Sequence, residues 1–163
     1  MASFTDALRA LGELSRTGVI EDYAVAGAMA IVFWAEPIPT YDLDVLVLLP
    51  KQPGPIVSLE GLVAWATARG YPLEAEHILV EGVPVQFLPS HNKLADEAIE
   101  TAETFDYEGV SVRVVRPEYL IALYLEPSAR TMKRRERAAA LREAPATDQD
   151  TLKALMERFN IAP

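Results

Sequence analysis

Two aspartates, Asp42 and Asp44, stand at the start of the most hydrophobic stretch of the chain, "PTYDLDVLVLLP" (residues 39–50). If this stretch is a β-strand, alternate residues share a face, so both carboxylates point to one side with their Cα atoms about 6.6 Å apart. Carboxylates at that spacing can converge on one divalent cation or clamp two. Like charges beside a core are costly unless they are compensated, and Mg²⁺ carrying substrate phosphates is the usual compensation.

The pair also has a simpler interpretation, in which both aspartates cap turns at a loop–strand junction and stay solvated. Gly27 favours the metal hypothesis, because "AVAGAMA" (residues 24–30) ends an expected strand and begins an expected helix. A glycine there lets a ligand approach the backbone, and the helix offers unpaired N–H groups to a phosphate. Taken alone, Gly27 could serve only a tight turn. Together, the glycine and the aspartates predict a site for a divalent cation that carries phosphates.

The elements expected along the chain give an α+β protein with a mixed β-sheet flanked by helices and a helical C-terminal region. Helices are expected at 3–16, 28–36, 58–70, 91–101, 117–126, 128–143 and 148–159, and strands at 21–27 and 39–50. Two hairpins are expected at 74–90 and 104–117, turning at Glu81-Gly82 and near Glu108-Gly109. No linker divides the chain, so we expect one domain over 1–163, with a catalytic-type core at about 1–116 and a helical part at about 117–163.

Composition excludes several classes of protein. The chain has 163 residues, a net charge of −9 and no cysteine, which excludes disulfides and thiolate metal sites and fits a cytoplasmic protein. Its longest apolar run, "VLVLL" (45–49), is too short to span a membrane. The segment 130–142 carries a net charge of +5 and the rest of the chain −14, so a broad nucleic-acid-binding surface is not expected. A local anion site remains open.

The basic segment has helical spacing. Its side chains at i, i+3, i+4 and i+7 would form one stripe on the helix expected at 128–143; they are Arg130, Lys133, Arg134 and Arg137. Facing the aspartates, this stripe would bind the β- and γ-phosphates of a nucleotide, whereas facing water it would be an ordinary solvated helix face. His77 and His91 have no partner at metal-ligand spacing and are expected to be structural.

Gly27-Ala28, followed by Thr40, Asp42 and Asp44 on a hydrophobic strand, resembles the DNA polymerase β-like nucleotidyltransferase superfamily. The run "GVPVQFLPSHNKLADEAIETAETFDYEGVSVRVVRPEYLIALYL" (82–125) is similar to the AbiEii-like branch, which contains abortive-infection and toxin–antitoxin proteins. The resemblance covers nearly the whole chain and implies a nucleotidyltransferase fold.

The resemblance also implies an activity, which is transfer of a nucleotide from an NTP to an acceptor hydroxyl with Mg²⁺ or Mn²⁺ as cofactor. The acceptor would be tRNA, a protein or a small molecule, and a cognate antitoxin is the implied protein partner. The implied catalytic metal ligands are Asp42 and Asp44, and the implied nucleotide-binding residues are Gly27, Ala28, Thr40, Arg130, Lys133 and Arg134.

Three residues depart from the pattern of that family. Gln86, on the strand 83–88, stands where a third carboxylate is expected, and its amide can offer a metal an oxygen but no charge. Tyr124 stands where the family tends to have a lysine, and Ala28 lacks a hydroxyl that many members carry. These departures leave an alternative open: a degenerate, non-catalytic member that binds a nucleotide or a protein within a toxin–antitoxin or defence system.

Overall fold

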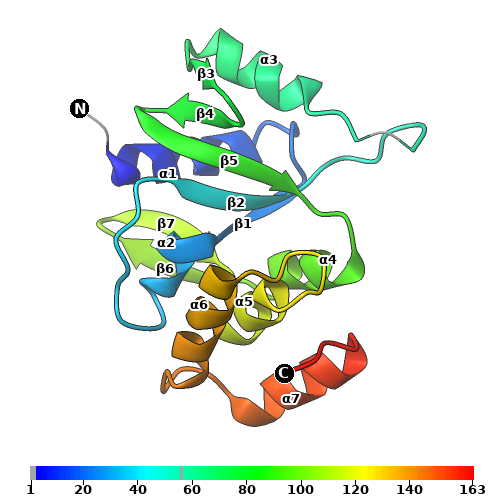
Figure 1. The fold of residues 1–163 in the computed structure, drawn as a ribbon. Helices are drawn as coiled ribbons and strands as arrows, with labels where there is room; N and C mark the ends of the chain where they lie inside the picture. The colour runs from blue at the N-terminus through cyan, green and yellow to red at the C-terminus, as the bar shows by residue number, and fades with distance from the viewer. Residues whose placement is uncertain (1–2, 56) are drawn as a thin grey trace.

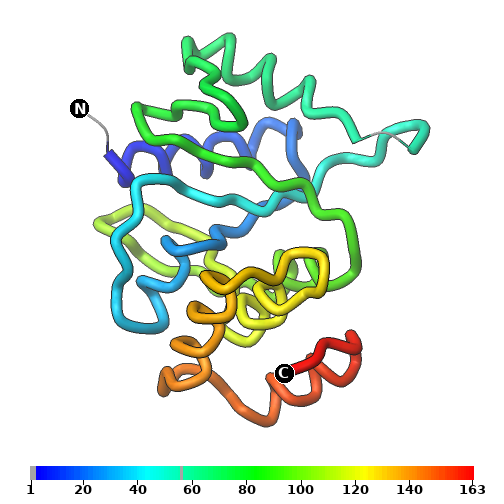
Figure 2. Tube along the Cα trace, viewed as in Figure 1, coloured from blue at the N-terminus to red at the C-terminus, as the bar shows by residue number. Residues whose placement is uncertain are grey.

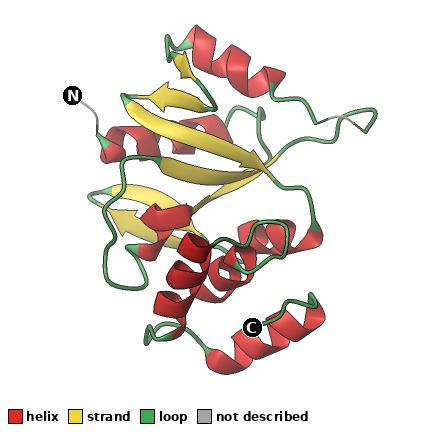
Figure 3. Cartoon of the chain, in the orientation of Figure 1, coloured by secondary structure: helices red, strands yellow, loops and turns green. Residues whose placement is uncertain are grey.

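The computed structural model describes residues 3–55 and 57–163, and it confirms an α+β fold built on a mixed sheet (Figures 1 and 3). The sheet has seven strands in the order β3-β4-β5-β2-β1-β7-β6. The elements are α1 (Phe4–Ser15), β1 (Asp22–Ala26), α2 (Gly27–Ile31), β2 (Leu43–Leu48), α3 (Glu60–Ala68), β3 (Leu73–Glu74), β4 (His77–Val80), β5 (Val83–Pro89), α4 (Lys93–Glu100), β6 (Glu103–Tyr107), β7 (Val110–Val114), α5 (Pro117–Tyr124), α6 (Met132–Arg142) and α7 (Gln149–Arg158).

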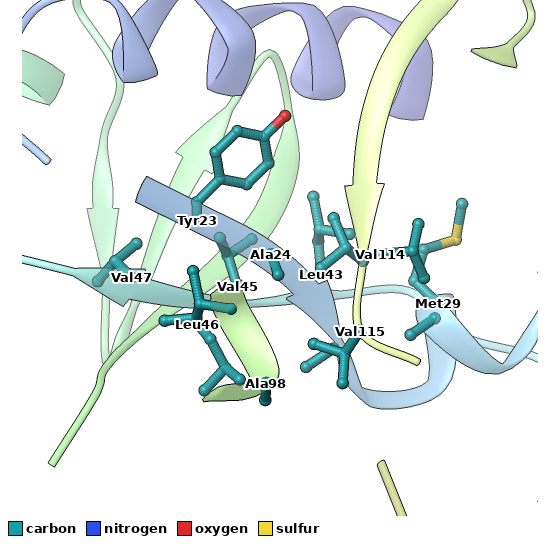
Figure 4. Close-up of a cluster of buried hydrophobic side chains, with 14 of the residues drawn as sticks. Tyr23, Ala24, Met29, Leu43, Val45, Leu46, Val47, Ala98, Val114 and Val115 are labelled. Carbon is teal, nitrogen blue, oxygen red and sulfur yellow. The ribbon is translucent and has the colours of Figure 1, made fainter. Parts of the chain in front are cut away.

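The centre of the sheet is the antiparallel pair β1–β2, flanked by parallel neighbours. β2 runs parallel to β5 and β1 runs parallel to β7, while β4 and β6 pair antiparallel on the outer sides. Figure 4 shows that Tyr23 of β1 points toward α1, whereas Leu46 of β2 points toward Ala98 of α4. Both faces of the central strands are therefore covered. A polar side chain on β2 is unusual for that reason.

Two of the expected helices begin at a capping side chain, and the expected hairpin turns are confirmed. Ser3 Oγ accepts a hydrogen bond from the backbone N–H of Asp6, and the side chain of Asp148 caps α7. Both hairpins turn where expected, because Glu81-Gly82 and Glu108-Gly109 all have positive φ, the conformation of a tight two-residue hairpin turn.

Besides the strand expected at 39–50, which spans only Leu43–Leu48 and leaves Thr40 and Asp42 in the loop before it, three expected elements differ from the structure. The helix expected at 28–36 ends at Ile31 and continues as tight turns, while the indole of Trp34 donates a hydrogen bond to Val115 O. The strand expected from 74 is broken at Ala75, whose φ of 56° reverses the chain so that β3 pairs antiparallel with β4.

The third difference concerns the basic segment. The helix expected at 128–143 begins only at Met132, because Thr131 Oγ1 accepts a hydrogen bond from the N–H of Arg134 and so caps the helix there. Arg130 consequently precedes α6, and the prediction of one helical stripe that includes Arg130 is wrong.

A long loop, residues 32–42, connects α2 to β2 (Figure 2), and it places Thr40 and Asp42 just before the first residue of β2. Among the helices of residues 3–55 and 57–163, none has the length and apolar character needed to traverse a lipid bilayer.

Candidate active site

The structure brings Asp44 against the glycine corner. In the antiparallel β1–β2 pair Ala26 lies opposite Asp44, so Gly27, the next residue, stands directly beside the carboxylate. Gly27 has a φ of +62°, and a Cβ there would overlap Asp44 Oδ2 and lie 3.0 Å from its Cγ. Only glycine fits this position, because any side chain would displace the carboxylate.

Asp42 lies one residue before β2 and is more exposed than Asp44. The hydroxyl of Thr40 donates hydrogen bonds to Asp42 Oδ1 at 3.2 Å and to Asp42 O at 3.0 Å. Oδ2 of Asp42 lies 3.7 Å from His77 Nε2. Thr40 therefore orients the carboxylate, and His77 approaches it from β4.

Asp42 borders a cleft of about 560 Å³. The cleft is lined by Pro39, Thr40, Tyr41, Asp42, Glu74, His77, Leu79, Pro84, Lys133 and Arg137. One wall is thus the loop before β2, the second is the β3–β4–β5 edge of the sheet, and the third is α6. The cleft has the size and the mixed polar lining of a small-molecule site.

The electrostatics of the carboxylate pair favour a bound cation. Burial raises the pKa of Asp44, and the neighbouring charge of Asp42 raises it further. Arg137, Arg134 and His77 lower that pKa in part. Because burial is the largest cause and the positive neighbours do not cancel it, the charged form of Asp44 is disfavoured, and a cation beside the carboxylate would favour that form.

The basic residues of α6 and of the loop before it lie in two different places. Lys133 and Arg137 line the cleft, and the guanidinium of Arg134 lies 5.8 Å from the ring centre of Tyr124. Arg130 lies elsewhere: its guanidinium donates hydrogen bonds to Leu125 O and to Ala162 O, each at 2.7 Å from Nη2. Of the basic residues predicted to bind phosphate, the structure brings Lys133 and Arg134 toward the aspartates and gives Arg130 backbone partners.

Gln86 lies directly opposite Asp44 in the parallel β2–β5 pair, so the two side chains share a face. Within the described residues, no group of three or more His, Asp or Glu side chains is arranged to hold a metal. Mg²⁺ needs only one or two carboxylates when phosphates complete its coordination. By donor chemistry alone, two carboxylates and one amide oxygen would suit one Mg²⁺ that also binds phosphates, and they lack the third charge that a second ion would require.

Sequence reasoning missed His77, Glu74 and Tyr41 as cleft residues. His77 lies two residues before Leu79 on β4, so these two side chains are on the same face of the sheet. Leu79 pairs with Pro84 of β5, and Pro84 shares its face with Gln86, so His77 and Gln86 are on one face. That inference requires the strand order β4–β5–β2, which the sequence pattern does not reveal. Tyr41 is 87% exposed beside Asp42, and no periodic pattern marks it.

No model of a known protein family matches the chain. No curated protein matches its sequence either.

Solved structures do match the fold. An antigenic nucleotidyltransferase-like protein from Paracoccidioides brasiliensis is 12% identical with a TM-score of 0.58, covering 97% of this chain and 88% of that one. The antibiotic-resistance factor ANT(2″)-Ia in solution is 17% identical with a TM-score of 0.52, covering 94% and 88%. Its crystal structure in complex with adenylyl-2″-tobramycin is also 17% identical, with a TM-score of 0.54, covering 95% and 93%. The chain therefore has the fold of nucleotidyltransferase-like proteins.

Proposed function

We propose that this protein binds a nucleoside triphosphate with Mg²⁺ in the cleft beside Asp42 and Asp44 and transfers the nucleotide to an acceptor hydroxyl. The observation that carries the proposal is the contact between Gly27 and Asp44. Gly27 takes its positive φ without strain, and this arrangement keeps any side chain away from the half-buried Asp44 carboxylate. Such an arrangement is expected if the Asp44 carboxylate binds a ligand at that corner.

The proposed reaction needs little covalent chemistry from the protein. The acceptor oxygen forms a bond to the α-phosphorus, the bond from that phosphorus to the bridging oxygen breaks, pyrophosphate leaves, and the proton of the acceptor hydroxyl passes to solvent water. Mg²⁺, when bound, would supply positive charge to the α-phosphate and the leaving pyrophosphate. Asp42 and Asp44 would hold the ion, Thr40 would orient Asp42, and Lys133 would attract the phosphates from α6.

The Gly27-Ala28 corner would let the triphosphate approach the backbone closely. Its helix α2 has only five residues, so the corner contributes space and N–H groups more than a strong dipole. The nature of the acceptor remains among tRNA, protein and small molecule. The complex of ANT(2″)-Ia with adenylyl-2″-tobramycin gives the small-molecule class one structural parallel.

A second function is favoured by Gln86. A neutral amide opposite Asp44 cannot take a proton from the acceptor, and it leaves the site one charge short of a two-ion centre. A nucleotide- or protein-binding component of a toxin–antitoxin or defence system would need only binding. Membership of the AbiEii-like branch, a cognate antitoxin and a cytoplasmic location belong to this proposal and rest on the sequence resemblance and composition.

Calorimetric titration with ATP, GTP, CTP or UTP in MgCl₂ tests the binding step. We expect saturable heat for the wild type with at least one nucleotide and none for Asp44→Asn, while Asp150→Asn, an exposed position on α7, matches the wild type. No heat with any nucleotide contradicts the proposal. Pyrophosphate release in the presence of candidate acceptors then separates transfer from binding alone.

A further inference from the structure

A second hollow, of about 570 Å³, lies between the end of α6, helix α7 and the residues that follow α7. Its apolar lining includes Leu152, Met156 and Ile161, which are 3%, 7% and 7% exposed. Figure 1 shows α7 at the helical end of the molecule, away from the strands. Among the described residues, none lines both this hollow and the cleft at Asp42. The hollow is therefore a separate space, and its volume is that of a small-molecule site.

Arg142, the last residue of α6, brings a positive charge to this hollow without a matching negative one. Its side chain is half-buried, and its Nη2 lies 3.5 Å from Met156 Sδ. A thioether sulfur is a weak acceptor, whereas a guanidinium is best satisfied by a carboxylate that accepts two parallel N–H bonds. None of the ion pairs formed within residues 3–55 and 57–163 involves Arg142. The guanidinium thus has a sulfur contact where a carboxylate would bind more strongly.

The other charged side chains of the lining offset one another. Lys153 and Glu157 are four residues apart on α7, so they lie on the same side of that helix. With Arg142, the lining holds two positive side chains and one negative one, a net charge of +1. A monovalent anion would balance this charge, and an amine would add to it.

We propose that the hollow binds a small organic acid, with its carboxylate on Arg142 and its apolar body against Leu152, Met156 and Ile161. The fork of the guanidinium would donate two hydrogen bonds to the carboxylate in place of the contact with Met156 Sδ. Met156 is flexible and polarizable, so it can repack against an apolar body. The inference goes beyond the proposed function and does not depend on it, because the nucleotide would occupy a different space.

The test is a titration of the ¹⁵N-labelled protein with 2-naphthoate, followed by amide chemical shifts. We expect saturable shifts confined to residues 142–163, with a dissociation constant of about 1 mM or tighter for a ligand of this size. Two probes separate charge from apolar body. Acetate has the carboxylate without the ring system, and 2-naphthylmethylamine has the ring system with the opposite charge, so neither should produce these shifts at the same concentration.

Three variants test the role of Arg142. Arg142→Gln should weaken 2-naphthoate binding by about tenfold or more, because a hydrogen-bonded charge is lost. Arg142→Lys keeps the charge without the planar fork, so it should bind more tightly than Arg142→Gln and more weakly than wild type. Arg9→Gln is the matched control, because Arg9 is an exposed residue of α1 that pairs with Asp6 and does not line the hollow.

A further variant fills the hollow without touching the charge. Ala162 is exposed and lines the hollow, and its carbonyl rather than its side chain bonds Arg130. Ala162→Trp should therefore abolish 2-naphthoate binding while the amide spectrum of residues 3–55 stays that of wild type.

Several outcomes would overturn the inference. They are no saturable shifts for wild type, equal binding of the amine, and wild-type affinity of Arg142→Gln. Displacement of 2-naphthoate by a nucleoside triphosphate with MgCl₂ would place the acid in the cleft at Asp42 and so contradict it too. Shifts of residues 142–163 that grow with protein concentration alone would assign the hollow to a second copy of the chain. Failure of the nucleotide titrations would remove the proposed function and leave this inference standing.

Discussion

At the scale of single residues, Asp44 and Gly27 form a contact that leaves no room for a side chain at position 27. The carboxylate is half-buried, faces Asp42 and touches a backbone that only glycine can provide. The alternation along β2 correctly predicted that Asp44 shares a face with Leu46 while its sequence neighbours are buried on the other face. The strength of the contact could not be predicted, because it depends on the antiparallel register that sets Ala26 opposite Asp44.

Gly27→Ala is expected to destabilise the protein and to abolish nucleotide binding. Alanine at this position must adopt a positive φ, which costs about 1–3 kcal/mol, and its Cβ must also push the Asp44 carboxylate aside. Gly18→Ala is the matched control, because Gly18 has a φ of +84° with nothing within 4 Å of the added Cβ. Urea unfolding should show the larger loss for Gly27→Ala, and equal losses would contradict a special contact at Asp44.

Asp44→Asn should stabilise the free protein at neutral pH, by about 1 kcal/mol, because it removes a charge that burial and Asp42 disfavour. The pKa of Asp44 is raised on folding, so the folded state binds its proton more tightly and stability falls as pH rises through that pKa. Unfolding curves of variant and wild type should therefore converge below about pH 4, the ordinary range of aspartate. A stability difference independent of pH would argue against a strained carboxylate.

At the scale of elements, local signals located caps and turns but did not decide which elements meet. The helix expected from 128 begins only at Met132, because the cap at Thr131 delays α6 and leaves Arg130 in the preceding loop. His77 enters the cleft only because the β4–β5 hairpin adds to the edge of β2, a long-range pairing that periodicity does not reveal. Tyr124 could be noted as unusual from the sequence, but its burial beneath Arg134 could not be foreseen, because it depends on the packing of α5 against α6.

Arg130→Gln should reduce stability more than nucleotide affinity. Its guanidinium joins the carbonyl of Leu125 at the end of α5 to that of Ala162, so its loss leaves both without this donor. We expect a loss of about 1–2 kcal/mol in unfolding free energy and a dissociation constant within about twofold of wild type. Arg137→Gln should show the reverse, and a large affinity loss for Arg130→Gln would restore the sequence prediction that it binds phosphate.

At the scale of the whole molecule, the C-terminal helices are tied to the sheet through α4. Arg158 of α7 donates to both carboxylate oxygens of Glu97, at 2.6 and 2.8 Å, and Tyr119 of α5 donates to the same group. Asp148 N, at the start of α7, donates to the buried Glu118. These hydrogen bonds predict that residues 117–163 unfold together with the core rather than separately.

Coincident urea transitions by far-ultraviolet circular dichroism and by tryptophan fluorescence would support one cooperative unit. Glu97→Gln should lower the stability of that unit by about 0.5–1 kcal/mol, since the ion pair is partly exposed. Arg158 lowers the pKa of Glu97, so the pair's contribution exists above the ordinary glutamate pKa of about 4.3 and is lost as pH falls below it. A separate early transition for the variant would show that α7 detaches alone.

The bond from Arg130 to Ala162 O has a practical consequence for handling the protein. A purification tag fused after Pro163 would begin two residues beyond the Ala162 carbonyl, which binds Arg130 in the loop before α6, the helix that carries Lys133 and Arg137 to the cleft. A tag placed before α1 would leave that anchor untouched, so affinities measured with the two fusions are expected to differ.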